Sequence, residues 1–317
     1  MTGATYDVVI PTIGRPSLAV LIASLAAASG PLPERVIVVD DRRDRREALR
    51  LGETGVLTGR ITLVAGDARG PAAARNRGWR AANAAWVAFV DDDVILSETW
   101  RADLTADLAA CSSDVVGVQG ILDVPLPRDR RPTDWERNVA GLATARWITA
   151  DLAYRREGLV AVDGFDERFP RAFREDADIA LRLVAHGYHL AQGTRHATHP
   201  VRPADMWVSV RLQAGNADDA LMSAVHGKDW HECAAADRGT FAQHVVTSSL
   251  AVTAALAAAG WVVATARFAW RRIEPGPRDA REIKTMLATS TVLPLAAVYH
   301  RIRGAVGIYR LRRELGR

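Results

Sequence analysis

A short apolar strand that runs directly into three aspartates is the feature that most constrains this chain. The apolar run Trp86–Val90 is followed at once by Asp91, Asp92 and Asp93. Adjacent carboxylates repel one another, so the cluster is costly unless cations neutralise it. At the carboxyl end of a buried parallel strand, such a cluster faces the crevice where open α/β sheets bind ligands. Two interpretations are open at this point, a divalent-metal site and a solvated acidic turn.

The composition is that of an ordinary globular protein. The 317 residues are 49% hydrophobic and 25% charged, with a net charge of +4. The two cysteines, Cys111 and Cys233, have neither metal-ligand nor disulfide spacing, which favours a reducing cytoplasm. The N-terminus lacks a basic region followed by an apolar stretch, so no signal peptide is expected. Basic residues are not interleaved with aromatic ones, and nucleic-acid binding is therefore not expected.

Strand and helix patterns alternate through the first half of the chain. Apolar runs predict strands at residues 7–11, 35–41, 60–64, 86–90 and 115–121. Helical patterns lie at residues 17–28, 71–85, 98–110 and 175–186. This alternation predicts an α/β fold with a mostly parallel sheet flanked by helices. We expect one domain at residues 1–205 and a helical C-terminal region at residues 206–317.

Several polar segments follow the predicted strands in a set order. Ile10–Pro16 follows the first strand, Asp41 ends the second, and Gly70–Gly78 opens a helix before the aspartate cluster. Further along come Thr149–Arg156, Val162–Phe169, Arg174–Leu183 and His196–Arg202. The strand ends lie at one edge of the sheet, so these side chains can converge on one ligand.

The ordered set resembles the inverting family 2 glycosyltransferases of the GT-A fold, over about residues 5–202. The resemblance implies a nucleotide-diphosphate sugar as donor and a hydroxyl of unknown identity as acceptor. It implies that the substrate is bound by Pro11, Thr12, Arg15, Asp41, Arg75, Asp91, Asp92, Glu175 and Arg202. Within this set, Thr12, Arg15 and Asp41 would hold the base and ribose. For Arg75 the alternative is a salt bridge on the helix surface, and for Arg202 a surface role.

The resemblance also implies a metal site and a general base. Asp91 and Asp93 would be the outer members of a DxD motif that binds Mn²⁺ or Mg²⁺, with Asp93 as the most direct ligand. His199 would complete the metal shell, with His196 as the alternative, although a structural histidine remains open. Asp176 would be the catalytic base that deprotonates the acceptor. Its alternative role is to complement the dipole of the helix that it begins.

The turn after the second strand departs from the family pattern. It reads Asp41-Arg42-Arg43-Asp44, where relatives commonly carry a Gly-Ser type of turn. These arginines could contact phosphate or mark an unusual donor, and they do not indicate the sugar.

An uncharged run from Val245 to Ala266 dominates the C-terminal third. It is long enough to span a bilayer, but it is rich in Ala, Ser and Thr rather than Leu. Three interpretations compete: a spanning helix, a helix lying on the membrane, and a helical hairpin used for packing or homodimerisation. The last two together are favoured over a span. Peripheral contact would place a cytoplasmic protein at the inner face of the cell membrane and would suit a lipid-linked acceptor.

Two rival functions are weighed against glycosyl transfer. A nucleotidyltransferase also uses an α/β sheet and metal-binding aspartates, but it usually carries a Gly-rich loop after the first strand, where this chain has only Gly14. A non-catalytic nucleotide-sugar-binding protein of the same fold is disfavoured because Asp91, Asp93 and Asp176 are all intact.

Overall fold

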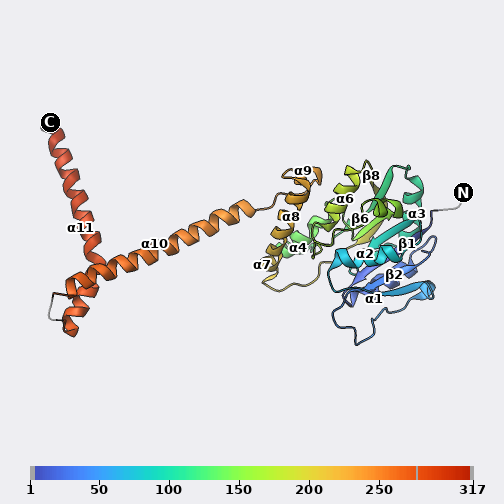
Figure 1. Ribbon diagram of the computed structural model, residues 1–317, viewed down its shortest axis with the longest axis horizontal. Coiled ribbons are helices and arrows are strands. Elements are labelled where there is room, and N and C mark those ends of the chain that lie inside the picture. The colour runs from blue at the N-terminus through green and yellow to red at the C-terminus, as the bar shows by residue number, and fades with distance from the viewer. Residues whose placement is uncertain (1–3, 276–277, 315–317) are drawn as a thin grey trace. The chain divides into compact units, whose positions relative to one another are not determined.

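The computed structural model describes residues 4–275 and 278–314, which pack as two units, Met1–Arg238 and Gly239–Arg317 (Figure 1). The strands of the first unit are β1 (Tyr6–Thr12), β2 (Val36–Asp40), β3 (Ile61–Ala65), β4 (Trp86–Val90), β5 (Ile95–Leu96), β6 (Val115–Asp123), β7 (Asp151–Arg155) and β8 (His189–Thr198). Its helices are α1 (Ser17–Ala27), α2 (Pro71–Ala81), α3 (Trp100–Ala110), α4 (Asp134–Ala140), α5 (Arg156–Ala161), α6 (Glu175–Ala185), α7 (Val208–Leu212), α8 (Asn216–His226) and α9 (Trp230–Cys233).

One eight-stranded sheet organises the first unit, in the order β3-β2-β1-β4-β7-β6-β8-β5. The strands β3, β2, β1 and β4 are parallel, as the helical crossovers predict. The strand β7 then enters antiparallel to both of its neighbours, and β6 and β8 are parallel again. The sequence-based prediction of an α/β fold with a largely parallel sheet is confirmed.

The strands β1, β2 and β4 are buried on both faces of the sheet, which explains why their sequences are apolar runs. Along β1, Val8 and Ile10 pack in one core cluster together with residues of α1 and α3. Val9, between them, packs in a second cluster with residues of α2 and α6. The two-residue period of a strand therefore delivers alternate side chains to two cores. The parallel pairing of β1 with β2 and β4 places the carboxyl ends of these three strands at one edge.

By packing, the first unit extends past the boundary expected at residue 205. The helices α8 and α9 cover α6 through a third cluster, in which Phe169 meets Met222 and Trp230. Ion pairs reinforce this contact, Arg171–Asp218 at 2.9 Å and Arg174–Asp219 at 2.7 Å. Residues 206–238 thus belong with the sheet. No composition break marks residue 238, so the sequence pattern alone did not indicate it.

The second unit consists of two long helices, α10 (Phe241–Ile273) and α11 (Ala280–Glu314). They pack near the end of α10, where Ala269 and Ile273 are buried and Arg272 donates to the hydroxyls of Thr289 and Ser290 at 2.8 and 3.0 Å. Among the described residues, α10 is the one helix long and apolar enough to cross a membrane, by length and composition. No side chain of its most apolar stretch is buried.

Candidate active site

Each of the three aspartates after β4 has an arginine as its partner. Asp91 meets Arg75 at 2.8 Å, and Asp92 meets Arg15 at 2.8 Å. Asp93 lies 3.0 Å from Arg202. The repulsion within the cluster is therefore offset by guanidinium groups of the chain itself. The solvated-turn interpretation does not describe this arrangement, because Asp92 and Asp93 are buried.

Asp92 holds the turn that follows β1. Its Oδ2 accepts a 2.5 Å hydrogen bond from the hydroxyl of Thr12, and its Oδ1 accepts one from Arg15. The hydroxyl of Thr12 accepts in turn from the N–H of Gly14 at 2.9 Å. The structure thus brings three predicted residues together, and both oxygens of Asp92 are used within the protein. Pro11 lies in β1, paired in register with Val39.

Asp41 lies beside this turn and anchors the loop that leads into α2. Its two carboxylate oxygens accept hydrogen bonds from the N–H groups of Ala68 and Gly70, at 2.7 and 3.0 Å. A Cβ on Gly66 would lie 2.4 Å from Oδ1 of Asp41, so the loop can approach only without a side chain there. Asp41 therefore shapes the loop, whatever further contact it makes with a nucleotide.

The arginine-rich turn after β2 is closed on itself. Arg42 donates two hydrogen bonds to the carboxylate of Asp40, at 2.8 and 2.7 Å. Arg45 donates to the carbonyl oxygens of Asp40 and Gly66. The hydrogen bonds from Arg42 also lower the pKa of the Asp40 carboxyl. These two arginines act as intramolecular partners in this arrangement.

Arg75 joins the aspartate cluster to the helix α6. It is buried, and its two terminal nitrogens donate to Oδ1 of Asp91 at 2.8 Å and to Oε1 of Glu175 at 2.7 Å. Its guanidinium also lies over the ring of Phe165, 5.6 Å from the centroid. The alternative for Arg75 was a salt bridge on the helix surface. The structure contains a buried ion pair instead.

Backbone contact brings the same two segments together. Gly70, the residue before α2, has φ of 99°, in the region that favours glycine. A Cβ built on Gly70 would lie 2.3 Å from the carbonyl oxygen of Pro170, in the loop before α6. The start of α2 and the approach to α6 therefore touch without an intervening side chain.

Glu175 and Asp176 begin α6 and differ in their surroundings. Burial, and then the neighbouring charge of Asp176, raise the pKa of Glu175 to about 8. Burial is also the main cause that raises the pKa of Asp176, whose side chain is nevertheless partly accessible. Within the described residues, the one hydrogen bond of this carboxylate comes from the N–H of Ala177, at 2.8 Å. An accessible carboxylate of raised pKa suits a general base.

Asp93 and His199, two of the residues expected to bind a metal, lie close together. Nε2 of His199 lies 3.6 Å from Oδ1 of Asp93, and Nδ1 of His199 is buried with no hydrogen-bond partner among the described residues. Burial, and then the charge of Asp91, raise the pKa of Asp93. His196, the alternative ligand, instead pairs with Asp123 at 2.9 Å on the exposed side of β8.

The side chains of Asp91, Asp93 and His199 are of the types that bind divalent cations. Within residues 4–275 and 278–314, no three His, Cys, Asp or Glu side chains form a metal cluster. Mg²⁺ is commonly bound through one or two carboxylates together with substrate phosphates, and imidazole suits Mn²⁺. Both carboxylates of this group are held by arginines in the structure, Asp91 by Arg75 and Asp93 by Arg202.

Two groups of residues near the site escaped the sequence-based predictions. Arg195 is fully buried and pairs with Asp151 at 2.8 Å and Asp107 at 3.1 Å, which ties β8 to β7 and α3. Nothing in the local pattern distinguished this arginine from a surface residue. The second group surrounds Trp135, whose indole donates to the carbonyl oxygen of Arg202 at 2.7 Å. The capping-box spacing of Thr133 and Glu136 was a signal for the helix that carries this tryptophan.

Comparison with known proteins assigns the class. Residues 7–158 match the profile of glycosyl transferase family 2. Among solved structures, the mannosyltransferase PcManGT from Pyrobaculum calidifontis, in complex with GDP-Man and Mn²⁺, is 18% identical with a TM-score of 0.52, over 92% of this chain and 88% of that one. TarS of S. aureus is 18% identical (TM-score 0.43), and GalNAc-T7 with UDP, GalNAc and Mn²⁺ is 16% identical (TM-score 0.49).

Coverage of these proteins is uneven. The matches take in 62% and 63% of this chain, but 35% of TarS and 44% of GalNAc-T7. No curated protein sequence matches the chain significantly. The fold defined by the sheet and its helices is that of GT-A glycosyltransferases. The segment 7–158 belongs to glycosyltransferase family 2, as the sequence-based resemblance predicted, and the chain thus carries a glycosyltransferase domain.

Proposed function

We propose that the protein transfers a sugar from a nucleotide-diphosphate sugar to an acceptor hydroxyl, with inversion and with the help of a divalent cation. The observation that carries the proposal is the position of Arg75, which contacts both the aspartate cluster and the start of α6. This single buried side chain links Asp91, in the expected donor site, to Glu175, the residue before the expected base. The GDP-Man and Mn²⁺ bound by PcManGT, a protein of the same fold, support a donor and a cation of these kinds.

Donor binding is proposed for the edge at β1, β2 and β4. Pro11, Thr12, Arg15 and Asp41 surround the turn after β1 and would contact the base and ribose. The diphosphate would lie near Arg75 and Arg202, whose side chains already bind the carboxylates of Asp91 and Asp93. Glu175 would keep Arg75 in place, because its own carboxylate is buried against that guanidinium. A divalent cation held by Asp93, Asp91 and His199 would supply charge neutralisation for the leaving diphosphate.

Asp176 is proposed as the base. It would accept the proton of the acceptor hydroxyl as the oxygen forms its bond to the anomeric carbon and the bond to the diphosphate oxygen breaks on the opposite face. The elevated pKa of this carboxyl makes it a better proton acceptor than an exposed aspartate. Its partial exposure leaves an oxygen available to a substrate.

Membrane contact is proposed for the second unit. Exposed apolar side chains lie on every side of α10, including Val246, Leu250, Leu256, Val262 and Val263. A helix that is apolar all round is suited to a lipid environment rather than to one packing face. The uncharged run Val245–Ala266 is followed by Arg267, Arg271 and Arg272, which favour an anionic membrane surface.

The test is calorimetric titration of the full-length protein with UDP, GDP, ADP and dTDP, each with Mn²⁺ and with EDTA. We expect one nucleotide to bind tightly with Mn²⁺ and weakly with EDTA. Equal affinity in both buffers would remove the metal from the proposal. Failure of all four nucleotides to bind would contradict the donor assignment.

A further inference from the structure

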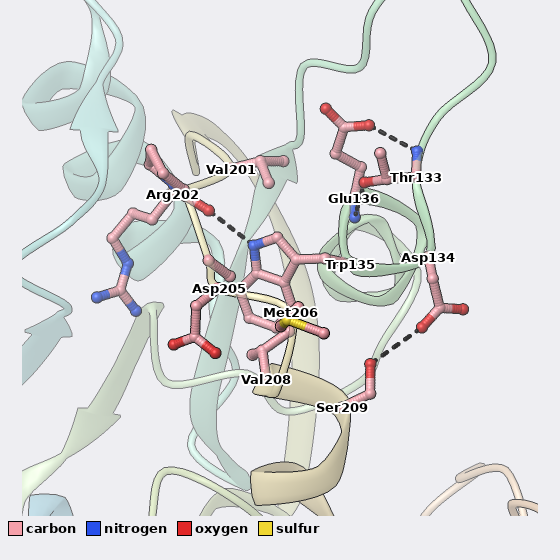
Figure 2. A pocket seen from close by; sticks show the side chains of 12 residues that line it. Thr133, Asp134, Trp135, Glu136, Val201, Arg202, Asp205, Met206, Val208 and Ser209 are labelled. Atoms are coloured by element: carbon pink, nitrogen blue, oxygen red, sulfur yellow. Dashed lines mark hydrogen bonds between the residues drawn. The ribbon is translucent and has the colours of Figure 1, made fainter.

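A pocket of about 450 Å³ lies beside the aspartate cluster (Figure 2). Its walls are residues 133–136, at the start of α4, and residues 201–206, 208 and 209, which follow β8 and enter α7. Two hydrogen bonds join the walls, from the indole N–H of Trp135 to the carbonyl oxygen of Arg202 at 2.7 Å and from the hydroxyl of Ser209 to Asp134 at 3.2 Å. This volume is within the usual range of small-molecule sites, about 300–1,000 Å³.

The pocket adjoins the catalytic centre through one residue. The backbone of Arg202 forms part of the pocket wall, and its guanidinium extends away from Trp135 in Figure 2. Nε of Arg202 lies 3.0 Å from Oδ2 of Asp93, in the site proposed for the metal and diphosphate. A molecule in the pocket would therefore lie next to the donor without occupying the donor's own site.

The polar side chains of the pocket are already paired. Glu136 binds Arg130 at 2.7 Å, and Asp205 binds Arg211 at 2.6 Å. The charges in the walls are thus balanced, and nothing there attracts an ionic ligand selectively. This lining is therefore not suited to a second nucleotide or to a phosphate group.

The unpaired surface is apolar. It comes from the ring of Trp135, from Val201 and Val208, and from Met206, whose side chain is 82% exposed. The exposed apolar surface continues along α7 with Val210, which is 61% exposed and does not line the pocket. An exposed methionine next to an indole face is a suitable contact for a flexible apolar chain.

We propose that this pocket binds the apolar part of the acceptor, a neutral alkyl or isoprenoid chain that carries the hydroxyl-bearing head group to the catalytic centre. The inference rests on the proposed function, since it assigns the acceptor of that reaction. A second feature of the chain supports a lipid-like acceptor. The apolar helix α10 begins at Phe241, three residues after Arg238, where the first unit ends.

The test uses octyl β-D-glucoside with a photoreactive diazirine in its alkyl chain. Full-length protein, kept in solution by an amphipathic polymer, is irradiated with this probe and the labelled peptides are identified by mass spectrometry. We expect label in residues 133–136 and 201–209. Unlabelled octyl glucoside should compete for it, and methyl glucoside, which has the same head group, should not.

Matched variants separate the pocket from other apolar surfaces. Met206→Gln should reduce labelling of these two segments about fivefold or more, since it removes apolar contact with the chain. Val210→Gln, an equally mild change at a neighbouring exposed residue, should leave the labelling unchanged. Three outcomes would overturn the proposal. They are labelling confined to α10, equal labelling of Met206→Gln and the unaltered protein, and competition by methyl glucoside. Cross-linking between two protein chains at this pocket, without probe, would overturn it in favour of a second copy.

Nucleotide titration of the same samples distinguishes the two proposals. Unchanged nucleotide affinity in Met206→Gln together with lost labelling supports the pocket as an acceptor site. Normal nucleotide binding with no labelling of the pocket refutes the acceptor assignment and leaves the donor site in place. Pocket labelling in a protein that binds no nucleotide refutes the acceptor assignment as well, since the pocket would then serve no glycosyl transfer.

Discussion

The guanidinium of Arg75 donates a 2.7 Å hydrogen bond to Glu175, a residue 100 positions further along the chain, and both side chains are buried. Because the same guanidinium also binds Asp91, its removal would leave Asp91 without its cation and Glu175 without its hydrogen-bond donor. Breaking a buried ion pair by removing one partner costs about 3–5 kcal/mol. We therefore expect Arg75→Met to lower the free energy of unfolding by about this amount, measured by denaturant titration.

Arg77→Met is the matched control for Arg75→Met. Arg77 lies on the same helix and pairs with Asp67, but both side chains are substantially exposed. An exposed ion pair contributes about 0–1 kcal/mol to stability, so the free energy of unfolding of this variant should be close to that of the unaltered protein. Equal loss of stability in both variants would contradict the role of Arg75 as an internal link.

Asp176→Asn should abolish sugar transfer while nucleotide affinity survives. An amide keeps the size of the side chain but accepts no proton, and general-base catalysis typically contributes about 10²–10⁴ in rate. The measurement compares turnover with the calorimetric affinity for the nucleotide. Asp163→Asn, at an exposed carboxylate paired with Arg80, serves as control and should retain activity. Near-normal turnover in Asp176→Asn would remove this residue as the base.

Glu175 should make stability depend on pH in a defined direction. Its pKa is raised from 4.5 to about 8 by burial and by Asp176, so between these values the folded protein binds a proton that the unfolded chain has lost. This contribution to stability is fully present below pH 4.5 and is lost as the pH rises through about 8. Glu175→Gln should flatten the decline, as followed by thermal unfolding at several pH values. An unchanged pH profile in the variant would show that other groups cause it.

Asp93→Ala should weaken nucleotide binding in Mn²⁺ but not in EDTA. The loss expected in Mn²⁺ is about tenfold or more, as is common when a metal site is disturbed. The matched control is Asp123→Ala, an exposed carboxylate at the end of β6 that pairs with His196. Unchanged affinity of Asp93→Ala in both buffers would count against the metal assignment.

Membrane contact by α10 should depend on its exposed leucines. The double change Leu250→Glu and Leu256→Glu places two charges in a stretch that has none, and we expect it to abolish flotation with vesicles of anionic and zwitterionic lipid. Val56→Glu is the control, because Val56 is a similarly exposed apolar residue of the first unit. Flotation that persists in the double variant, or no flotation of the unaltered protein, would contradict the membrane proposal.

The sequence was sufficient for the parts of the fold that depend on local pattern. The runs of apolar residues identified β1, β2 and β4, and the rule that parallel strands end at one edge placed Asp41 and the aspartate cluster together. The same rule could not indicate the partner of each carboxylate. The pairs Arg75–Glu175 and Arg15–Asp92 form only when the sheet and helices pack together, because the partners are far apart in the sequence.

Other features were hidden because they depend on contacts between distant segments. The burial of Arg195 follows from two acidic residues on separate elements, which no window of sequence contains. The extent of the first unit to Arg238 follows from the packing of Met222 and Trp230 on the loop before α6 and on α6 itself. In both cases the local pattern is ordinary, and the tertiary contact gives the residue its role.

Gly70 determines how closely the two halves of the site approach. With no side chain at this position, the start of α2 and the loop before α6 meet backbone to backbone, and a Cβ would lie 2.3 Å from the carbonyl oxygen of Pro170. A methyl group at position 70 would push α2, which carries Arg75, away from the segment that leads into α6, which carries Asp176. The separation of the two segments that carry Arg75 and Asp176 therefore depends on a glycine that bears no functional group of its own.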